Sequence, residues 1–156
     1  SGSLYLMLQG KLPQGINHLR IGEAVVLGRE TSFGQKLPGM YDDVFTLKTE
    51  VVESKVKPSL PFGQIGVDAF GGRGTYRDKG DMRRVIAACG RQDTLCADLI
   101  PRDPSLEFVG ASSDHMIWDA TAADPPPQVG DVLEFLLPYG ALLAACTSEY
   151  IHKQII

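Results

Sequence analysis

The sequence has 156 residues, of which 44% are hydrophobic and 22% are charged, and its formal net charge is −4. These proportions are typical of a soluble globular protein, and they exclude a disordered chain, a coiled coil and a collagen-like repeat. The net negative charge gives no electrostatic reason to expect nucleic acid or an anionic membrane as a partner.

The first half of the chain predicts few but distinct elements. The first forty residues offer one possible helix and one buried strand, over 21–27, which Gly28 ends. Residues 44–56 alternate between polar and apolar side chains, which predicts a long antiparallel strand that ends near Pro58. A turn-rich, glycine-rich segment follows over 61–80. Residues 82–89 predict a strand more than a helix, because Val85 and Ile86 are β-branched and Gly90 follows.

Short strands are predicted in the second half, over 106–110, 116–119 and 132–137. The proline run within 122–128 predicts an exposed loop, because proline donates no backbone hydrogen bond. A helix is expected to begin near Leu142, with Gly140 at its entry. Many short strands joined by turns predict a mostly-β barrel or sandwich from about residue 40 onward. The first forty residues look instead like the end of an α/β unit.

The sequence also bears on compartment and on metal binding. Its three cysteines are an odd number without metal-ligand spacing, so we expect no disulfide scaffold, no metal site and a reducing cytoplasmic location. The longest apolar stretch, 133–146, is too short for a membrane span and contains Glu134, Pro138 and Gly140. The chain lacks an initiator methionine and a signal peptide, and we expect it to be a piece of a longer protein.

Three polar clusters are candidates for function. Ser112-Ser113-Asp114-His115 is either a polar turn that caps its own backbone or a ligand site, and the sequence favours neither. Arg91-Gln92-Asp93 follows a buried segment, and its simplest interpretation is a surface ion pair. Arg20-Ile21-Gly22-Glu23 opens the predicted strand, where backbone N–H groups near the glycine could face an anion while the guanidinium faces a ring acceptor.

Taken in order along the chain, these segments resemble the C-terminal part of fold-type III, pyridoxal-phosphate-dependent amino-acid racemases, in the branch that includes ornithine racemase. The resemblance covers nearly the whole chain, and the order of its segments is more specific than any one of them. The segments are Leu19-Arg20-Ile21-Gly22-Glu23-Ala24, Leu27-Gly28-Arg29-Glu30, Tyr41-Asp42-Asp43-Val44-Phe45, Glu53-Ser54-Lys55-Val56-Lys57-Pro58-Ser59, Asp68-Ala69-Phe70-Gly71, Gly90-Arg91-Gln92-Asp93, Gly110-Ala111-Ser112-Ser113-Asp114-His115, Val129-Gly130-Asp131, Tyr139-Gly140-Ala141-Leu142-Leu143 and Thr147-Ser148.

The resemblance implies a two-domain parent with an N-terminal (β/α)8 barrel that holds pyridoxal phosphate. Residues 1–38 would then be the end of that barrel, and residues 39–156 the C-terminal β-domain, which is a β-barrel in alanine racemase-like proteins. The lysine that binds the cofactor would lie upstream of Ser1. The cofactor-binding residues implied are Ser1, Arg20, Gly22, Glu23 and Tyr139.

Arginine can only donate hydrogen bonds and stays protonated, so Arg20 would keep a facing pyridine nitrogen unprotonated. The ring would then be a weaker electron sink, which suits loss and return of the α-proton without side reactions. Racemisation needs a proton-transferring group on each face of the α-carbon. The absent lysine would serve one face, and a tyrosine of the partner subunit serves the other in alanine racemase.

Phe70 occupies the position of that tyrosine and cannot transfer a proton, so the second base must be another group. Asp68, His115 and Tyr76 are the candidates, with Asp68 and His115 preferred. The resemblance further implies that Ser113 meets the substrate carboxylate and that Asp114 orients the second base.

The expected protein is a homodimer with shared active sites that racemises an amino acid, with ornithine or lysine suggested by the resemblance alone. Asp42, Asp43 or Asp68 could pair with the distal ammonium of such a substrate, or each could be a solvated surface charge. The alternative from another class is a non-catalytic β-barrel module that binds a partner or a small ligand.

Overall fold

The computed structural model describes residues 2–67, 71, 72, 74 and 77–155. The chain divides into two compact units, Ser1–Thr46 and Leu47–Ile156. The first contains helices α1 (Gly2–Leu8) and α2 (Glu23–Leu27). No helix within the described ranges is both long and apolar enough to cross a membrane.

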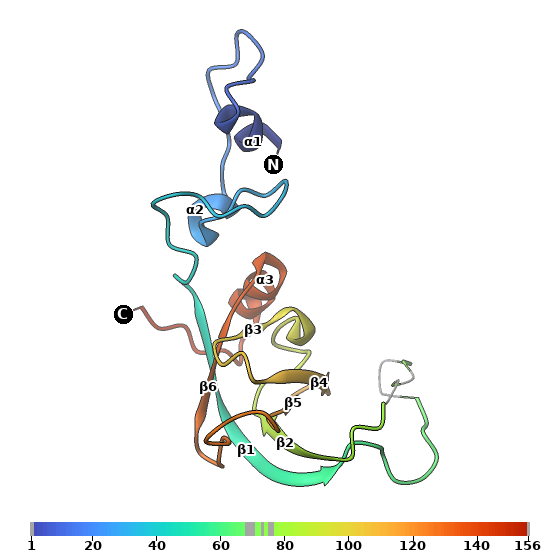
Figure 1. Cartoon of the computed structure of the whole chain (residues 1–156). Helices are drawn as coiled ribbons and strands as arrows, with labels where there is room; N and C mark the ends of the chain where they lie inside the picture. The colour runs from blue at the N-terminus through green and yellow to red at the C-terminus, as the bar shows by residue number, and fades with distance from the viewer. Residues whose placement is uncertain (1, 68–70, 73, 75–76, 156) are drawn as a thin grey trace. The chain divides into compact units, whose positions relative to one another are not determined.

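The second unit is built on one six-stranded sheet with the strand order β3-β6-β1-β2-β5-β4. The strands are β1 (Thr46–Pro58), β2 (Asp81–Ala87), β3 (Ile100–Pro101), β4 (Glu107–Ala111), β5 (Met116–Asp119) and β6 (Val132–Leu136), accompanied by the 3₁₀ helix η1 (Cys96–Asp98) and helix α3 (Tyr139–Thr147). Figure 1 shows that β1 is long and bends along its length, which curls the sheet. The predicted mostly-β class is therefore confirmed.

The bend of β1 follows from its sequence and its pairing. Leu47 and Val51 are buried while Lys48 and Glu50 are exposed, as the predicted alternation requires. The antiparallel register against β2 shifts between Val51 and Glu53, and a bulge of this kind bends the bulged strand. The curled sheet encloses a core centred on fully buried aromatic, sulfur-containing and aliphatic side chains, namely Trp118, Phe135, Met116, Val51 and Val85.

Most predicted strands are found close to their expected bounds, with β5 matching at both ends. The segment 82–89 forms β2, which confirms the preference for a strand, and residues 122–128 form a loop without strand pairing. Helix α3 begins at Tyr139, three residues before the predicted start. Strand β3 and helix η1 were not predicted, because elements of two and three residues carry no hydrophobic period.

The predicted buried strand over 21–27 is wrong, because residues 23–27 form helix α2. A short apolar run does not distinguish a buried strand from a helix. The decisive residue is Gly28, which takes a left-handed conformation with φ 63° and donates its N–H to the Ala24 carbonyl at 3.0 Å. A Cβ at Gly28 would also lie 2.3 Å from the Tyr41 carbonyl oxygen. The segment is only partly buried, since Val25 is exposed.

A buried carboxylate holds the loop after α2. Glu30 is 1% exposed and accepts hydrogen bonds from the backbone N–H groups of Ser32, Phe33 and Gln35 at 2.8, 2.7 and 3.2 Å. Burial works to raise the pKa of Glu30, but these donors outweigh it and hold the pKa below its usual value of 4.5. The ionised carboxylate therefore stabilises this loop.

We expect Glu30→Gln to weaken the loop most at neutral pH. Because the folded pKa lies below the unfolded one, the contribution of the charge is complete above about pH 4.5 and is lost as the pH falls through the folded value. Hydrogen exchange at the amides of Ser32, Phe33 and Gln35 measures this directly, with Glu50→Gln on the exposed face of β1 as the control. Equal protection of these amides in wild type and Glu30→Gln from about pH 3 to about pH 7 would contradict the role of the charge.

Candidate active site

Three of the predicted cofactor-binding residues, Arg20, Gly22 and Glu23, line one cleft. This cleft has a volume of about 220 Å³ and is lined by Leu4, Arg20, Ile21, Gly22, Glu23, Ala24 and Thr31. Nothing lies within 4 Å of the position where a Cβ would be added at Gly22, so a ligand can approach the backbone there. A guanidinium that only donates hydrogen bonds and an accessible glycine backbone thus share one concave surface, a combination suited to an anionic ligand with a ring acceptor.

A second, more polar hollow in the same unit has a volume of about 440 Å³ and is lined by Lys36, Gly39, Met40, Tyr41, Asp42 and Asp43. Asp42 pairs with Lys36 at 2.8 Å and with Arg29 at 3.0 Å. The hydrogen bond from Lys36 is the main cause of the lowered pKa of Asp42. Two cations already balance this carboxylate, so Asp42 is poorly suited to receive a substrate ammonium.

In the second unit, Ser112-Ser113-Asp114-His115 is the turn between β4 and β5. The Ser112 N–H donates to the His115 carbonyl at 2.8 Å, and the hydroxyls of Ser112 and Ser113 donate to Asp114 Oδ1 at 3.1 and 3.2 Å. His115 Nδ1 lies 3.1 Å from the same carboxylate oxygen. The turn interpretation is therefore correct, and the turn also gathers hydroxyls, a carboxylate and an imidazole on an exposed edge.

The contact with Asp114 determines what His115 can do. Burial works to raise the pKa of Asp114, but hydrogen bonding from Ser112, its own backbone N–H and the nearby His115 together lower it. A carboxylate that accepts a hydrogen bond from Nδ1–H fixes the neutral tautomer, which leaves Nε2 as the acceptor. The imidazole side chain is 45% exposed, so Nε2 can meet a ligand. The contact with Asp114 thus orients the imidazole ring.

The turn is held by the segment that follows β2. The N–H groups of Arg91 and Gln92 donate to the carbonyls of Ser112 and Ser113, both at 2.9 Å. A Cβ at Gly90 would lie 2.3 Å from the Ser113 carbonyl oxygen and 2.4 Å from the Asp114 nitrogen. Only glycine allows this approach, and no side-chain pattern in the sequence signals such a requirement.

The interpretation of Arg91-Gln92-Asp93 as a surface ion pair is wrong for its carboxylate. Asp93 is 5% exposed and accepts hydrogen bonds from the Gly90 N–H at 3.2 Å and from the Ser148 hydroxyl at 2.9 Å. Thr94 next to it donates to the Ala141 carbonyl of α3 at 3.0 Å. These buried bonds tie the loop that supports the turn to both ends of α3, a pairing of distant segments that sequence reasoning missed.

Among the remaining predicted site residues, the structure describes Tyr139. Tyr139 is the first residue of α3 and is half exposed. Ser1, Asp68 and Tyr76 lie outside the described residues. Among the residues that are described, no group of three or more His, Cys, Asp or Glu side chains is placed to bind a metal ion.

Comparison with known proteins gives two curated relatives. The chain is 52% identical over 156 residues to ornithine racemase from Acetoanaerobium sticklandii, which is 100% of this chain and 44% of that protein. It is 42% identical over 151 residues to lysine racemase from Thermotoga maritima, which is 97% of this chain and 42% of that protein. The chain thus spans less than half the length of these relatives and matches their C-terminal part.

No family model matches the chain, and no solved structure matches it. The identities to the two racemases nevertheless extend over all or nearly all of its residues. The chain is therefore similar to the C-terminal part of these two amino-acid racemases.

Proposed function

We propose that the protein containing this chain is a pyridoxal-phosphate-dependent racemase of a basic amino acid, ornithine or lysine. The observation that carries this proposal is the 52% identity to an ornithine racemase over the whole of this chain, joined by the 42% identity to a lysine racemase. Both relatives are named for amino acids with a distal ammonium group. The function is therefore proposed at the level of that substrate class.

The cleft of the first unit suits the cofactor by its donor set. Pyridoxal phosphate offers a phosphate and a ring nitrogen, which are both acceptors, and the cleft offers the donor-only guanidinium of Arg20 and the open backbone at Gly22 and Glu23. When bound, the cofactor draws electrons from the substrate α-carbon and so acidifies the α-proton. Arg20 would hold the ring nitrogen unprotonated, and we assign phosphate contacts to Ser1, Gly22, Glu23 and Tyr139.

Proton transfer on one face of the substrate is assigned to the turn of the second unit. His115 Nε2 is the atom that would take or return the α-proton, with Asp114 holding the ring through Nδ1 at 3.1 Å. Ser113 would meet the substrate carboxylate beside it. Asp68 is the competing candidate for the same step. An upstream lysine would serve the opposite face.

The two sets of residues belong to different compact units, and the shared-site homodimer is proposed from the resemblance to alanine racemase. We propose that the cleft of one subunit is completed by the Ser112–His115 turn of its partner. This arrangement would explain why the second unit, which does not contain the Arg20 cleft, contains an oriented imidazole on an exposed edge.

An enantiomer-resolved assay of the full-length protein tests the proposal. Purified protein is incubated with each enantiomer of ornithine, lysine, arginine, alanine and serine, with and without added pyridoxal phosphate, and the opposite enantiomer is measured. Formation of the opposite enantiomer of ornithine or lysine, dependent on the cofactor, is the expected result. A protein that binds no cofactor and exchanges no α-proton would refute the proposal and favour a binding module.

Arg20→Met should weaken cofactor binding by roughly ten- to hundredfold, because a hydrogen bond from a charged group contributes roughly 1.5–3 kcal/mol. Affinity is measured by titrating the apo full-length protein with pyridoxal phosphate and following cofactor absorbance. Arg29→Met is the matched control, since Arg29 lies in the same unit but pairs with Asp42. Equal affinity in wild type and Arg20→Met would remove Arg20 from the cofactor site.

A further inference from the structure

The turn at residues 112–115, which contains His115, is backed by the loop at residues 90–94 that follows β2. Two backbone N–H groups of this loop donate to carbonyls of the turn, both at 2.9 Å. Gly90 lies so close to the Ser113 backbone that a Cβ added to it would be 2.3 Å from the Ser113 carbonyl oxygen. The place of the turn therefore depends on what holds the 90–94 loop.

Gly90 is held by the far end of the same loop. Its carbonyl accepts the N–H groups of Asp93 and Thr94 at 3.0 and 3.2 Å. Its own N–H donates to Asp93 Oδ2 at 3.2 Å. Asp93 therefore binds both polar groups of the glycine backbone that touches the turn.

The other oxygen of the Asp93 carboxylate is bound from the end of helix α3. Oδ1 accepts the hydroxyl of Ser148, the C-cap residue of α3, at 2.9 Å. The Thr94 hydroxyl donates to the Ala141 carbonyl of α3 at 3.0 Å. Asp93, Thr94 and Ser148 are all buried, so water competes little for these bonds. The 90–94 loop is thus fastened to α3 at two points.

Two cysteines lie near this carboxylate. Burial, followed by the charge of Asp93, raises the pKa of Cys89 to about 12, and burial raises the pKa of Cys96 to about 11. Both thiols therefore stay protonated near neutral pH, which makes them poor nucleophiles. The chemistry of this cluster suits a support for the turn better than a second reactive centre.

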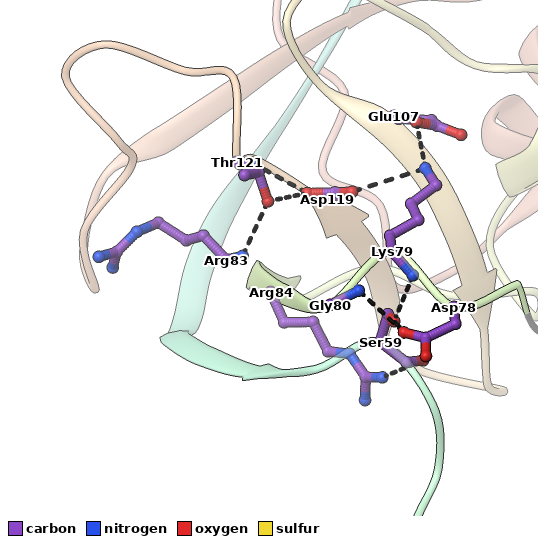
Figure 2. A network of polar contacts seen from close by, with 9 residues as sticks. All are labelled: Ser59, Asp78, Lys79, Gly80, Arg83, Arg84, Glu107, Asp119 and Thr121. Carbon is purple, nitrogen blue, oxygen red and sulfur yellow. Dashed lines mark hydrogen bonds and ion pairs between the residues drawn. The ribbon is translucent and has the colours of Figure 1, made fainter.

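The opposite end of the β4–β5 hairpin is fixed separately, as Figure 2 shows. Lys79 Nζ lies 2.7 Å from Glu107, where β4 begins, and 3.7 Å from Asp119, where β5 ends. The Thr121 hydroxyl accepts the Arg83 N–H of β2 at 2.9 Å and donates to Asp119 Oδ1 at 2.5 Å. Loosening Asp93 should therefore release the turn while the open end of the hairpin stays in place.

We propose that Asp93 is a positioning residue that sets the place and the ring orientation of His115, with Ser148 as its anchor. The inference rests on the proposed function, in which His115 Nε2 takes or returns the α-proton. Asp93 would act through Gly90 and the turn, not on the reacting atoms. A carboxylate is required because one oxygen accepts from Gly90 and the other from Ser148, whereas an amide has one acceptor oxygen.

Nitrogen NMR of the full-length protein, labelled in its histidine rings, tests the orientation. Asp114 holds His115 through Nδ1, so the wild type should show mainly the Nδ1–H tautomer. Asp93→Asn and Ser148→Ala should shift this population toward that of His152, an exposed imidazole in the same spectrum. The loss of one resonance in His115→Ala assigns the signal.

Turnover tests whether this orientation is used. Asp93→Asn should lower kcat by roughly ten- to hundredfold, because a displacement of about 1 Å can cost about a hundredfold. Deuterium uptake should slow more from one substrate enantiomer, the same one that His115→Ala affects. Ser148→Ala keeps the carboxylate and removes one donor, so it should give a smaller loss in the same direction.

The chain offers matched controls with the same chemistry in an exposed loop. Asp103 Oδ1 accepts the N–H and the hydroxyl of Ser105 at 2.9 and 2.6 Å, between β3 and β4. Asp103→Asn and Ser105→Ala therefore remove equivalent groups without touching the 90–94 loop. Both should keep the wild-type His115 spectrum, kcat and deuterium uptake.

The outcomes separate this inference from the proposed function. An unchanged His115 tautomer in both Asp93→Asn and Ser148→Ala would overturn the positioning role, whatever the activity. A changed tautomer with wild-type kcat, or with equal losses from both enantiomers, would show that the reaction does not use this orientation and would also overturn it. A wild type that racemises no amino acid would overturn the proposed function, while the spectra would still decide whether Asp93 orients His115.

Discussion

Gly90→Ala in the full-length protein should lower racemase turnover by about a hundredfold. The new Cβ would lie 2.3 Å from the Ser113 carbonyl oxygen and 2.4 Å from the Asp114 nitrogen, so the turn between β4 and β5 must move. Both neighbours are backbone atoms, which cannot rotate away as the end of a flexible side chain would. A displacement of about 1 Å in the group that transfers a proton costs roughly this factor. Initial rates with each enantiomer measure the effect.

The second expected effect of Gly90→Ala is on stability. Forcing extra volume into a packed contact costs about 1–3 kcal/mol, measured as a change in the free energy of unfolding by urea. Gly110→Ala is the matched control, since nothing lies within 4 Å of an added Cβ in the neighbouring strand β4. Gly90→Ala with wild-type turnover and wild-type stability would show that the turn tolerates displacement and plays no part in catalysis.

His115→Ala should slow α-proton exchange from one substrate enantiomer by about 10²–10⁴-fold, and from the other far less. The reason is that each face of the α-carbon is served by a different group, and only one face would lose its base. Deuterium uptake from heavy water, followed separately for each enantiomer, measures this asymmetry. Asp114→Asn should give a smaller loss in the same direction, because it disturbs the contact with His115 Nδ1 at 3.1 Å.

The same measurement decides between the two candidate bases. If His115 is the base, Asp68→Asn should not slow deuterium uptake from one enantiomer more than from the other. If instead Asp68→Asn slows uptake from one enantiomer and His115→Ala does not, the step is assigned to Asp68. His152→Ala is the control, since it removes an exposed imidazole of the same unit outside the turn. If both His115→Ala and Asp68→Asn exchange as the wild type does, neither residue serves as the second base.

Strong periodicity explains which elements could be predicted. In β1 the side chains of Leu47, Thr49 and Val51 are buried on one face, so the period of two is visible in the sequence itself. The segment 21–27 has no such period, and its conformation was decided by Gly28, whose left-handed φ ends a helix. A glycine after an apolar run is compatible with the end of a strand as well, so the prediction failed there.

The candidate site also has a part that could be predicted and a part that could not. Arg20, Gly22 and Glu23 lie within four consecutive residues, and all three line one cleft. The support of the turn could not be predicted in this way, because Gly90 and Ser113 are distant in the chain and meet through backbone atoms. Asp93 was expected on the surface because aspartate is usually exposed. Its carboxylate is instead buried, where it accepts hydrogen bonds from the Ser148 hydroxyl and the Gly90 N–H.

The amino-acid sequence was enough to predict the mostly-β class, the approximate bounds of the longer strands and the resemblance to the C-terminal part of amino-acid racemases, because these depend on local period and on the order of short motifs. The three-dimensional fold was needed to show that α2 is a helix, that Gly90 must lack a side chain, and that Asp93 is buried between the Gly90 N–H and the Ser148 hydroxyl. Each of these depends on atoms brought together across long stretches of chain. Side-chain identity limits such contacts, but the folded path of the backbone determines which of them form.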